Sequence, residues 1–277
     1  MGSARSTLRP LVAFVATAAG AQPPSASPAD DRVREQFLQQ AEVVSVQSAG
    51  IGSLRALLRR GGLLHDAGIQ AVDESVPTGD PPTVIEADVR GSYKHDVAAY
   101  RLDRLLGLGM VPVTILRDHG RKPAAFAWSV DDMLMTERER YVARARPPDV
   151  ASWNRQLAEV ALFDQLISNL DRSAGNLIID RGWQVWLTGH SRAFRSSRSL
   201  QNPKALGDSC ERRLLGALRT LAAPSVKAEM RDVLDEAQVD GLLARRDQIV
   251  AYYERMIADR GQAAVLYDLP PRGGGDR

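Results

Sequence analysis

The sequence predicts an α+β fold of two lobes, with an antiparallel sheet in the N-terminal lobe and mostly helices in the C-terminal lobe. Short β-like runs separated by glycine and polar turns fill the first third of the chain. From Pro148 onward, apolar residues recur at helical spacing. The 277 residues are 44% hydrophobic and 25% charged, which is typical of a globular protein with one large core or two modest ones.

The two ends of the chain are expected to lie outside this fold. Residues 1–21 carry two arginines, an apolar stretch and then small residues, which is the order of features in a secretory signal peptide. We expect cleavage near Ala21 and export to a periplasmic or extracellular compartment, with a disordered alanine-rich leader as the alternative. Residues 22–31 are expected to form a linker, and residues 269–277 a disordered tail.

Charge and cysteine content exclude several classes of function. Two of the 36 Lys and Arg residues lie in the expected leader, which leaves 34 against 34 Asp and Glu. A neutral chain gives no electrostatic reason to expect nucleic acid or an anionic membrane as a partner. The apolar stretch of the leader is shorter than the roughly 20 residues that a membrane span needs. Cys210 is the only cysteine, so it forms no internal disulfide and is expected to be buried.

The N-terminal lobe is expected over residues 32–130. Its strands are predicted at VVSVQ, at LRALL and near AGIQAV, each bounded by turn residues. Ser92 is a predicted N-cap for a helix that Gly107 and Gly109 end. The following MVPVTIL predicts a strand, which Pro112 would confine to an edge or a bulge.

The C-terminal lobe is expected over residues 131–268. One apolar stripe predicts a long helix from Trp153 to Ile167, and further helices are predicted at ERRLLGALRTL, VKAEMRDVLDEA and VDGLLARRDQIVAYYERMI. Between them, LII and WQVWL around Asp180 predict a β-hairpin that returns the chain to Asn176. A ligand cleft is expected between the two lobes.

The segment NLDRSAGNLIIDRGWQVWLTGHSRAF carries the candidate chemistry. Its loop holds Asp171 and Asn176 at the end of a long helix. Phosphoryl transfer to a hydroxyl needs one carboxylate to orient the nucleophile and an amide oxygen to bind Mg²⁺. Asp180 is the nearest other acid, but it lies about 13 Å along an extended strand from Asn176, so it is expected to be a turn residue.

This segment resembles the catalytic segment of the protein-kinase-like superfamily, in particular of phosphatidylinositol 3-/4-kinases, HipA-like kinases and secreted Golgi-type kinases. Those families share a D-R-x-x-x-N loop followed by a strand that ends in a metal-binding Asp. Upstream, SYKHDVAAYRLDRLLGLGMVPVTIL is similar to their helix and following strand. The resemblance implies a kinase-like fold, with ATP and Mg²⁺ or Mn²⁺ as the cofactors to expect.

By position, the resemblance implies roles for four residues of the loop and the helix. Asp171 would be the catalytic acid, with Arg172 beside it in the motif, and Asn176 would bind the metal. Asp96 would be a shortened replacement for the helix Glu that pairs with a nucleotide-binding Lys. Gly50 and Gly52 would lie in the loop over the phosphates, although a lone G-x-G is common in turns.

Two positions depart from the kinase pattern. Gly189, in Thr188-Gly189-His190, stands where the resemblance places the metal-binding Asp. Gln70, in AGIQ, stands where a strand Lys is expected. His190 is expected to be a packed structural residue, because a hard Mg²⁺ ion prefers oxygen ligands.

Three functions follow as hypotheses. The first is an exported, degenerate pseudokinase with impaired phosphotransfer and a binding or regulatory role. The second is an active atypical kinase that uses ATP and a divalent metal. The third is a secreted scaffold that no longer binds nucleotide. The partner, a protein or a small molecule, and the oligomeric state stay open.

Overall fold

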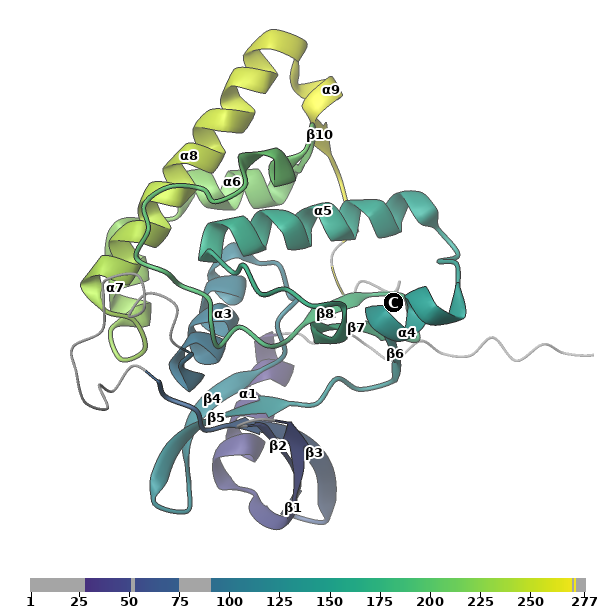
Figure 1. Cartoon of the computed structure of the whole chain (residues 1–277), viewed down its shortest axis with the longest axis vertical. Coiled ribbons are helices and arrows are strands. Elements are labelled where there is room, and N and C mark those ends of the chain that lie inside the picture. Colours follow the sequence, from purple (N-terminus) through teal and green to yellow (C-terminus); the bar gives the residue numbers. More distant parts are fainter. Residues whose placement is uncertain (1–27, 51–52, 75–90, 271, 273–277) are drawn as a thin grey trace, which may run out of the picture.

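The computed structural model describes residues 28–50, 53–74, 91–270 and 272 (Figure 1). The expected signal peptide therefore lies outside the described residues. The first element is helix α1 (Pro28–Gln40). Residues 28–31 are thus helical and not part of a linker, because Phe37 and Leu38 of the same helix are buried and anchor it to the lobe.

The N-terminal lobe contains a five-stranded sheet. Its strands are β1 (Glu42–Gly50), β2 (Ser53–Arg60), β3 (Leu63–Gln70), β4 (Thr114–His119) and β5 (Lys122–Trp128). They lie in the order β1-β2-β3-β5-β4, and every neighbouring pair is antiparallel. The antiparallel sheet predicted for this lobe is confirmed.

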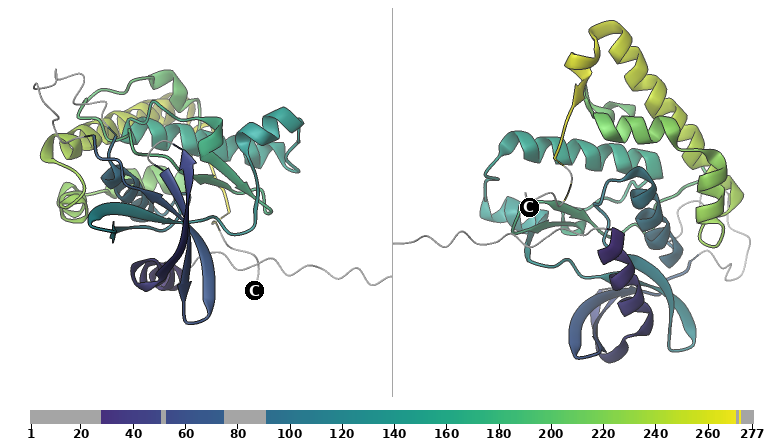
Figure 2. Two further views of the ribbon diagram at one scale, coloured as in Figure 1. Left: turned by 60° about the horizontal axis from the view of Figure 1, so that its bottom comes forward. Right: turned by 180° about the vertical axis from the view of Figure 1, so that it is seen from behind.

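Helix α3 (Tyr93–Leu106) packs on β4 and β5, as does α1 (Figure 2). Ser92 is its N-cap, and its hydroxyl accepts a hydrogen bond from the Lys94 amide at 3.3 Å. Gly107 ends the helix in the left-handed conformation, with φ of 67°. Both predicted ends of this helix are confirmed.

The segment between α3 and β4 is a packed connection and not the start of the predicted strand. Strand β4 begins at Thr114, so Pro112 lies outside it. Met110 and Val111 are buried, and the Met110 carbonyl accepts a hydrogen bond from the Leu187 amide of the C-terminal lobe. The connection is irregular because its backbone bonds to another lobe instead of to a neighbouring strand.

The C-terminal lobe is mostly helical, as predicted. Its longest helices are α5 (Val150–Ile167) and α8 (Glu236–Arg260). The smaller elements are β6 (Met133–Thr136), α4 (Glu137–Ala143), η1 (Ala174–Asn176), β7 (Leu177–Asp180), β8 (Val185–Leu187), η2 (Pro203–Leu206), β9 (Cys210–Glu211), α6 (Arg212–Thr220), α7 (Ala223–Met230), α9 (Gln262–Val265) and β10 (Leu266–Tyr267).

One predicted helix of this lobe is shorter than expected. The pattern VKAEMRDVLDEA predicts a single helix, but α7 ends at Met230 and α8 begins at Glu236. Asp235 forms a capping box with Gln238 at the start of α8. The apolar residues Val233 and Leu234 in the turn are buried, so they fit the helical pattern without being helical.

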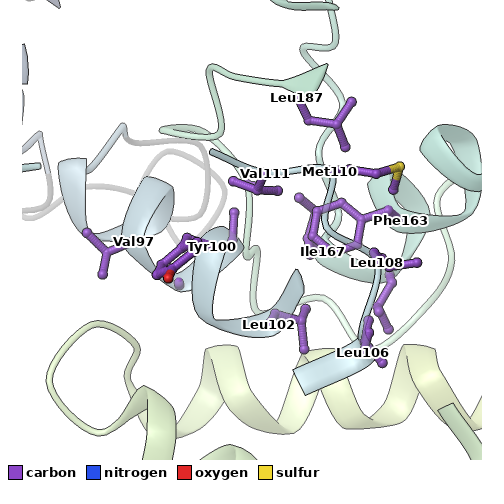
Figure 3. Close-up of a cluster of buried hydrophobic side chains, with 14 of the residues drawn as sticks. Val97, Tyr100, Leu102, Leu106, Leu108, Met110, Val111, Phe163, Ile167 and Leu187 are labelled. Atoms are coloured by element: carbon purple, nitrogen blue, oxygen red, sulfur yellow. The ribbon is translucent and has the colours of Figure 1, made fainter. Parts of the chain in front are cut away.

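The hydrophobic core joins the two lobes. Side chains from α3, from the connection after it, from α5 and from β8 meet in one cluster (Figure 3). Phe163 and Ile167 of α5 lie beside Met110 and Leu187 in that view, and all four are fully buried. The connection and β8 are therefore fixed against α5, which places the segment after β8 relative to the helix before the loop.

Two further findings concern the whole described chain. Cys210 is buried, as predicted, in the short parallel pair β9-β10. Among the described residues, no helix is both long enough and apolar enough to cross a membrane.

Candidate functional site

Asp171 follows α5 in the loop that leads to η1. Its side chain is 45% exposed, and one carboxylate oxygen lies 3.4 Å from a guanidinium nitrogen of Arg192. The Asp171 amide donates a hydrogen bond to the Asn169 side chain at 3.3 Å, which fixes the turn. The carboxylate is thus held in place and open to solvent, as a group that orients an incoming hydroxyl must be.

Arg172 points away from this solvent-facing side. Its guanidinium makes two hydrogen bonds to the Asp164 carboxylate, at 2.8 and 2.9 Å, and a third to the Thr188 carbonyl at 2.6 Å. The Arg172 and Asp164 side chains are only 12% and 9% exposed. Arg172 was predicted as a catalytic residue, and the structure gives it a positioning role instead, because its donors are taken up by the protein.

The predicted hairpin brings Gly189 beside Asn176. Strands β7 and β8 pair antiparallel with Leu177 opposite Leu187, and the Thr188 amide donates to the Asn176 carbonyl at 3.0 Å. Gly189 has φ of 69°. A Cβ atom on it would lie 2.4 Å from the Asn176 side-chain nitrogen. The Asn176 amide therefore fills the space that a side chain at position 189 would need.

Asp96 of α3 holds the segment that follows Gly189. One of its carboxylate oxygens accepts a hydrogen bond from the His190 amide at 2.7 Å. His95, its neighbour, bonds the Ser191 carbonyl at 2.7 Å through Nδ1. Gln70, which replaces the strand Lys of the resemblance, instead donates to the Ser53 hydroxyl at 3.3 Å and accepts from the Val72 amide at 3.3 Å.

His190 is buried, as expected for a structural histidine. Its side chain is 1% exposed and packs edge-on against Phe163, with ring centroids 6.3 Å apart. Burial lowers the pKa of the His190 imidazole, and the Asp96 carboxylate opposes that shift. Burial likewise lowers the pKa of His95. Both rings are therefore neutral near pH 7 and add no positive charge at the site.

The glycines predicted to cover the phosphates fall at the tip of the β1-β2 hairpin. Gly50 is the last residue of β1 and has φ of 141°, with open space where a Cβ would be. Gly52 lies outside the described residues. The structure brings Gly50 and Gln70 to the same sheet, and brings Asp96, Asn176, Arg172 and Gly189 to the segment after β8.

The residues available to a metal are few. No cluster of three or more His, Cys, Asp or Glu side chains suited to a metal occurs in the part of the chain that the structure describes. Asn176 and Asp171 supply the oxygen atoms in the loop.

A cavity of about 710 Å³ is lined by α1, α3, β4 and the end of α7, and not by Asp171 or Asn176. This cavity is therefore not a ligand cleft at the Asp171 loop.

Two residues that contact the loop were missed in the sequence. Arg192, which pairs with Asp171, lies in HSRAF and carries no distinguishing spacing. Asp164 lies in the apolar stripe of α5, where an acidic residue among buried neighbours indicates a buried ion pair. That signal was available in the sequence.

No family model and no curated protein match this sequence. Solved structures do match its fold. The structure of hydra Fam20 with sugar matches with a TM-score of 0.62 and 12% identity, over 87% of this chain and 93% of that one. The Golgi casein kinase with Mn/ADP bound matches with a TM-score of 0.61 and 13% identity, over 88% of this chain and 81% of that one. The fold is kinase-like.

A bacterial kinase extends the comparison. The proinflammatory kinase CtkA of Helicobacter pylori matches with a TM-score of 0.50 and 12% identity, over 79% of this chain and 96% of that one. Identities this low establish the fold alone. Within the kinase-like fold of this chain, α3 and the five-stranded sheet form the N-terminal lobe, and Asp171, Asn176 and Gly189 lie in the C-terminal lobe.

Proposed function

We propose that this chain is an exported, degenerate kinase-like protein that binds a nucleotide, transfers phosphate poorly, and has a binding or regulatory role. The observation that carries the proposal is Gly189. It has no carboxylate, its backbone is left-handed, and the Asn176 amide occupies the space of its missing side chain. A kinase-like site built this way lacks one metal ligand.

The remaining residues are compatible with a nucleotide. Asn176 and Asp171 would supply the protein oxygens for a divalent cation, and Mg²⁺ accepts few protein ligands when water and phosphates complete its shell. When bound, such a cation neutralises charge on the transferred phosphoryl group. The solved Golgi casein kinase with Mn/ADP bound supports a nucleotide and a metal in this fold.

The size of the expected defect follows from the electrostatics. A catalytic metal contributes several kcal/mol of transition-state stabilisation. A site that loses about 4 kcal/mol works about a thousandfold more slowly, since each 1.36 kcal/mol is tenfold in rate. Gln70 in place of a lysine removes a second positive charge from the phosphates. Strong phosphotransfer is therefore not expected.

An active kinase is the second candidate, and the state of Asp171 favours it. Its carboxylate is about half exposed and its backbone is fixed in the loop, although Arg192 lies beside it. The third candidate is a scaffold that binds no nucleotide and uses its helices to hold a partner.

Thermal unfolding of the purified chain separates the three candidates. The midpoint is measured with and without ATP, each with and without Mg²⁺ or Mn²⁺. A ligand at a hundred times its dissociation constant adds about 2.7 kcal/mol to stability, which shifts the midpoint by several degrees. A metal-independent shift, or a metal-dependent shift without phosphate transfer, supports the proposal. A metal-dependent shift, followed by phosphate transfer that Asp171→Asn abolishes, would establish an active kinase, and no shift would leave the scaffold.

A paired substitution tests the assigned positions. Gly189→Asp with Gln70→Lys restores both charged groups, and we expect metal-dependent nucleotide affinity to rise. Gly189→Ala with Gln70→Lys is the matched control, because it meets the same crowding at Asn176 without supplying a ligand. Equal affinities for the two variants would contradict the assignment of position 189.

A further inference from the structure

Arg272 occupies a pocket on the side of α5 that faces the connection after α3. After β10 the chain passes α5 toward β8 (Figure 1). The Arg272 guanidinium donates to the Val185 carbonyl at 2.6 Å and to the Gln156 side-chain oxygen at 3.3 Å. The Glu159 carboxylate lies 4.0 Å from it. Position 272 falls in the expected disordered tail, and the structure shows it bound.

The pocket is buried and has the features of a built site. The side chains of Arg272 and Glu159 are 13% and 7% exposed. Gln156 is buried and also binds β8, since its oxygen accepts from the Val185 amide at 3.0 Å and its nitrogen donates to the Trp183 carbonyl at 3.1 Å. Two acceptors from different elements, the Val185 carbonyl of β8 and the Gln156 oxygen of α5, thus converge on one planar cation beside the Glu159 carboxylate of α5, and this geometry suits a guanidinium and not an ammonium.

Close packing on the stem of Arg272 adds shape to this charge recognition. A Cβ atom on Gly109 would lie 3.7 Å from both Cβ and Cδ of Arg272. Gly109 has φ of 67°, and its amide donates to the buried Asp103 carboxylate at 3.0 Å. The space that remains beside the arginine is small, about 30 Å³, which is about the volume of one water molecule.

We propose that this pocket is a specific binding site for an alkylguanidinium group, filled by Arg272 of the same chain. Its walls are the connection after α3, α5 and β8. These are the elements that join the two lobes and lead into Thr188 and Gly189. Occupancy of the pocket therefore stabilises the junction between the lobes. An arginine side chain is the ligand class that the pocket accepts.

Chemical rescue of Arg272→Ala in the full chain tests the proposal. We expect its thermal midpoint to fall by about 4 °C or more, because a buried charged donor and its hydrogen bonds are lost. Methylguanidinium, below denaturing concentrations, should then raise the thermal midpoint of the variant up to a plateau. It should not raise the midpoint of the wild type. Methylammonium should rescue neither, because it offers no planar pair of donors.

Matched variants make the result specific. Arg121→Ala is the control, because Arg121 is exposed in the β4-β5 turn and has no ion pair among the described residues. Adding Glu159→Gln to Arg272→Ala should weaken the rescue. If Arg272→Ala does not fold, Arg272→Lys replaces it. Its thermal midpoint is expected to lie below those of the wild type and of Arg121→Ala, and hydrogen exchange at the Val185 amide is expected to be faster.

Two outcomes would overturn the proposal. The first is a thermal midpoint of Arg272→Ala equal to that of Arg121→Ala. If Arg272→Lys is used, the corresponding outcome is the same equality together with unchanged hydrogen exchange at the Val185 amide. The other is an equal response of the variant and the wild type to methylguanidinium, since that would leave no guanidinium site to fill.

Discussion

The Arg172 guanidinium joins three parts of the C-terminal lobe through three hydrogen bonds. It binds Asp164 on α5 and the Thr188 carbonyl that precedes Gly189, while its own backbone belongs to the Asp171 loop. Because both charged side chains are almost fully buried, water could not solvate the charge of one side chain if the other were removed. The loop geometry around Asp171 therefore depends on this pair.

Arg172→Ala is expected to destabilise the protein by about 3 kcal/mol or more, because it leaves the Asp164 carboxylate buried without its partner. Arg172→Lys should cost less stability, but it loses the bidentate geometry. The measurement is urea unfolding of these two variants, of Asp164→Asn alone, and of Asp164→Asn combined with Arg172→Ala. A double variant as unstable as the sum of the single changes would argue against a coupled pair.

At the scale of single residues, the sequence predicts the loop better than its partners. Asp171 and Asn176 are five positions apart on one short loop, so their proximity follows from spacing alone. Arg192 reaches Asp171 across 21 positions, and no local pattern predicts that contact. The contact between Asp96 and the His190 amide was not predicted for the same reason, since side-chain partners between distant elements depend on packing.

The β7-β8 hairpin is the element that places Gly189. Asp180 fixes its turn: one carboxylate oxygen accepts from the Gln184 amide at 2.9 Å, and the other accepts from the Trp186 indole at 2.9 Å. Trp183 adopts a left-handed conformation in this turn, with φ of 59°. Asp180 is therefore the last residue of β7, and its side chain fixes the turn that was expected there.

Asp180→Ala should destabilise the hairpin by about 1 to 3 kcal/mol, since it removes both acceptors and leaves the Trp186 indole donor unpaired. Arg181→Ala is the matched control on the next residue, whose side chain is exposed. Thermal unfolding compares the two variants. Equal midpoints would show that the turn holds without the carboxylate.

At the scale of elements, hydrophobic periodicity predicted where most helices and strands lie, but not where packing overrides it. Met110 and Val111 have the pattern of a strand, yet they form the buried connection that bonds to Leu187. The turn between α7 and α8 likewise keeps apolar residues at helical spacing. In both cases burial accounts for the pattern, and periodicity cannot separate burial from regular structure.

Buried titratable groups set opposite pH trends for the whole molecule. The pKa values of His95 and His190 are lowered by burial, so their contribution to stability is lost as the pH falls below about 6.5 and the unfolded chain binds protons. Burial raises the pKa of Glu159 from 4.5 to about 7, and the Arg272 guanidinium opposes this shift. The stability that comes from protonated Glu159 is present below pH 4.5 and is lost as the pH rises through about 7.

As the pH rises from 5 to 8, we expect the wild type to lose stability relative to Glu159→Gln, by on the order of 2 kcal/mol in the free energy of unfolding. For His190→Gln, the difference should become less favourable to wild type as the pH falls from 7 to 5. Thermal midpoints across this range measure both. The charged groups that face Glu159 are Arg272, Glu211, Arg213 and Asp103, and those that face His190 are Asp96, Arg172 and Asp164. A flat difference for either variant would contradict the assigned shift.

At the scale of the molecule, the two-lobed α+β fold was predictable because a sheet-rich segment precedes a helix-rich one along the chain. The position of Arg272 was not predictable from the sequence. Proline and glycine after residue 269 indicate a tail, and only the tertiary structure brings Arg272 to the pocket beside Gln156.

The position of β10 and Arg272 has a consequence for biosynthesis. Strand β10 pairs with β9, and Arg272 contacts α5 and β8, so β10 and Arg272 complete parts of the structure that are translated much earlier. While these residues are still inside the ribosome, the emerging chain holds Glu159 and Gln156 without their partner. The nascent protein must therefore wait until β10 and Arg272 have emerged before the junction between its lobes reaches native stability.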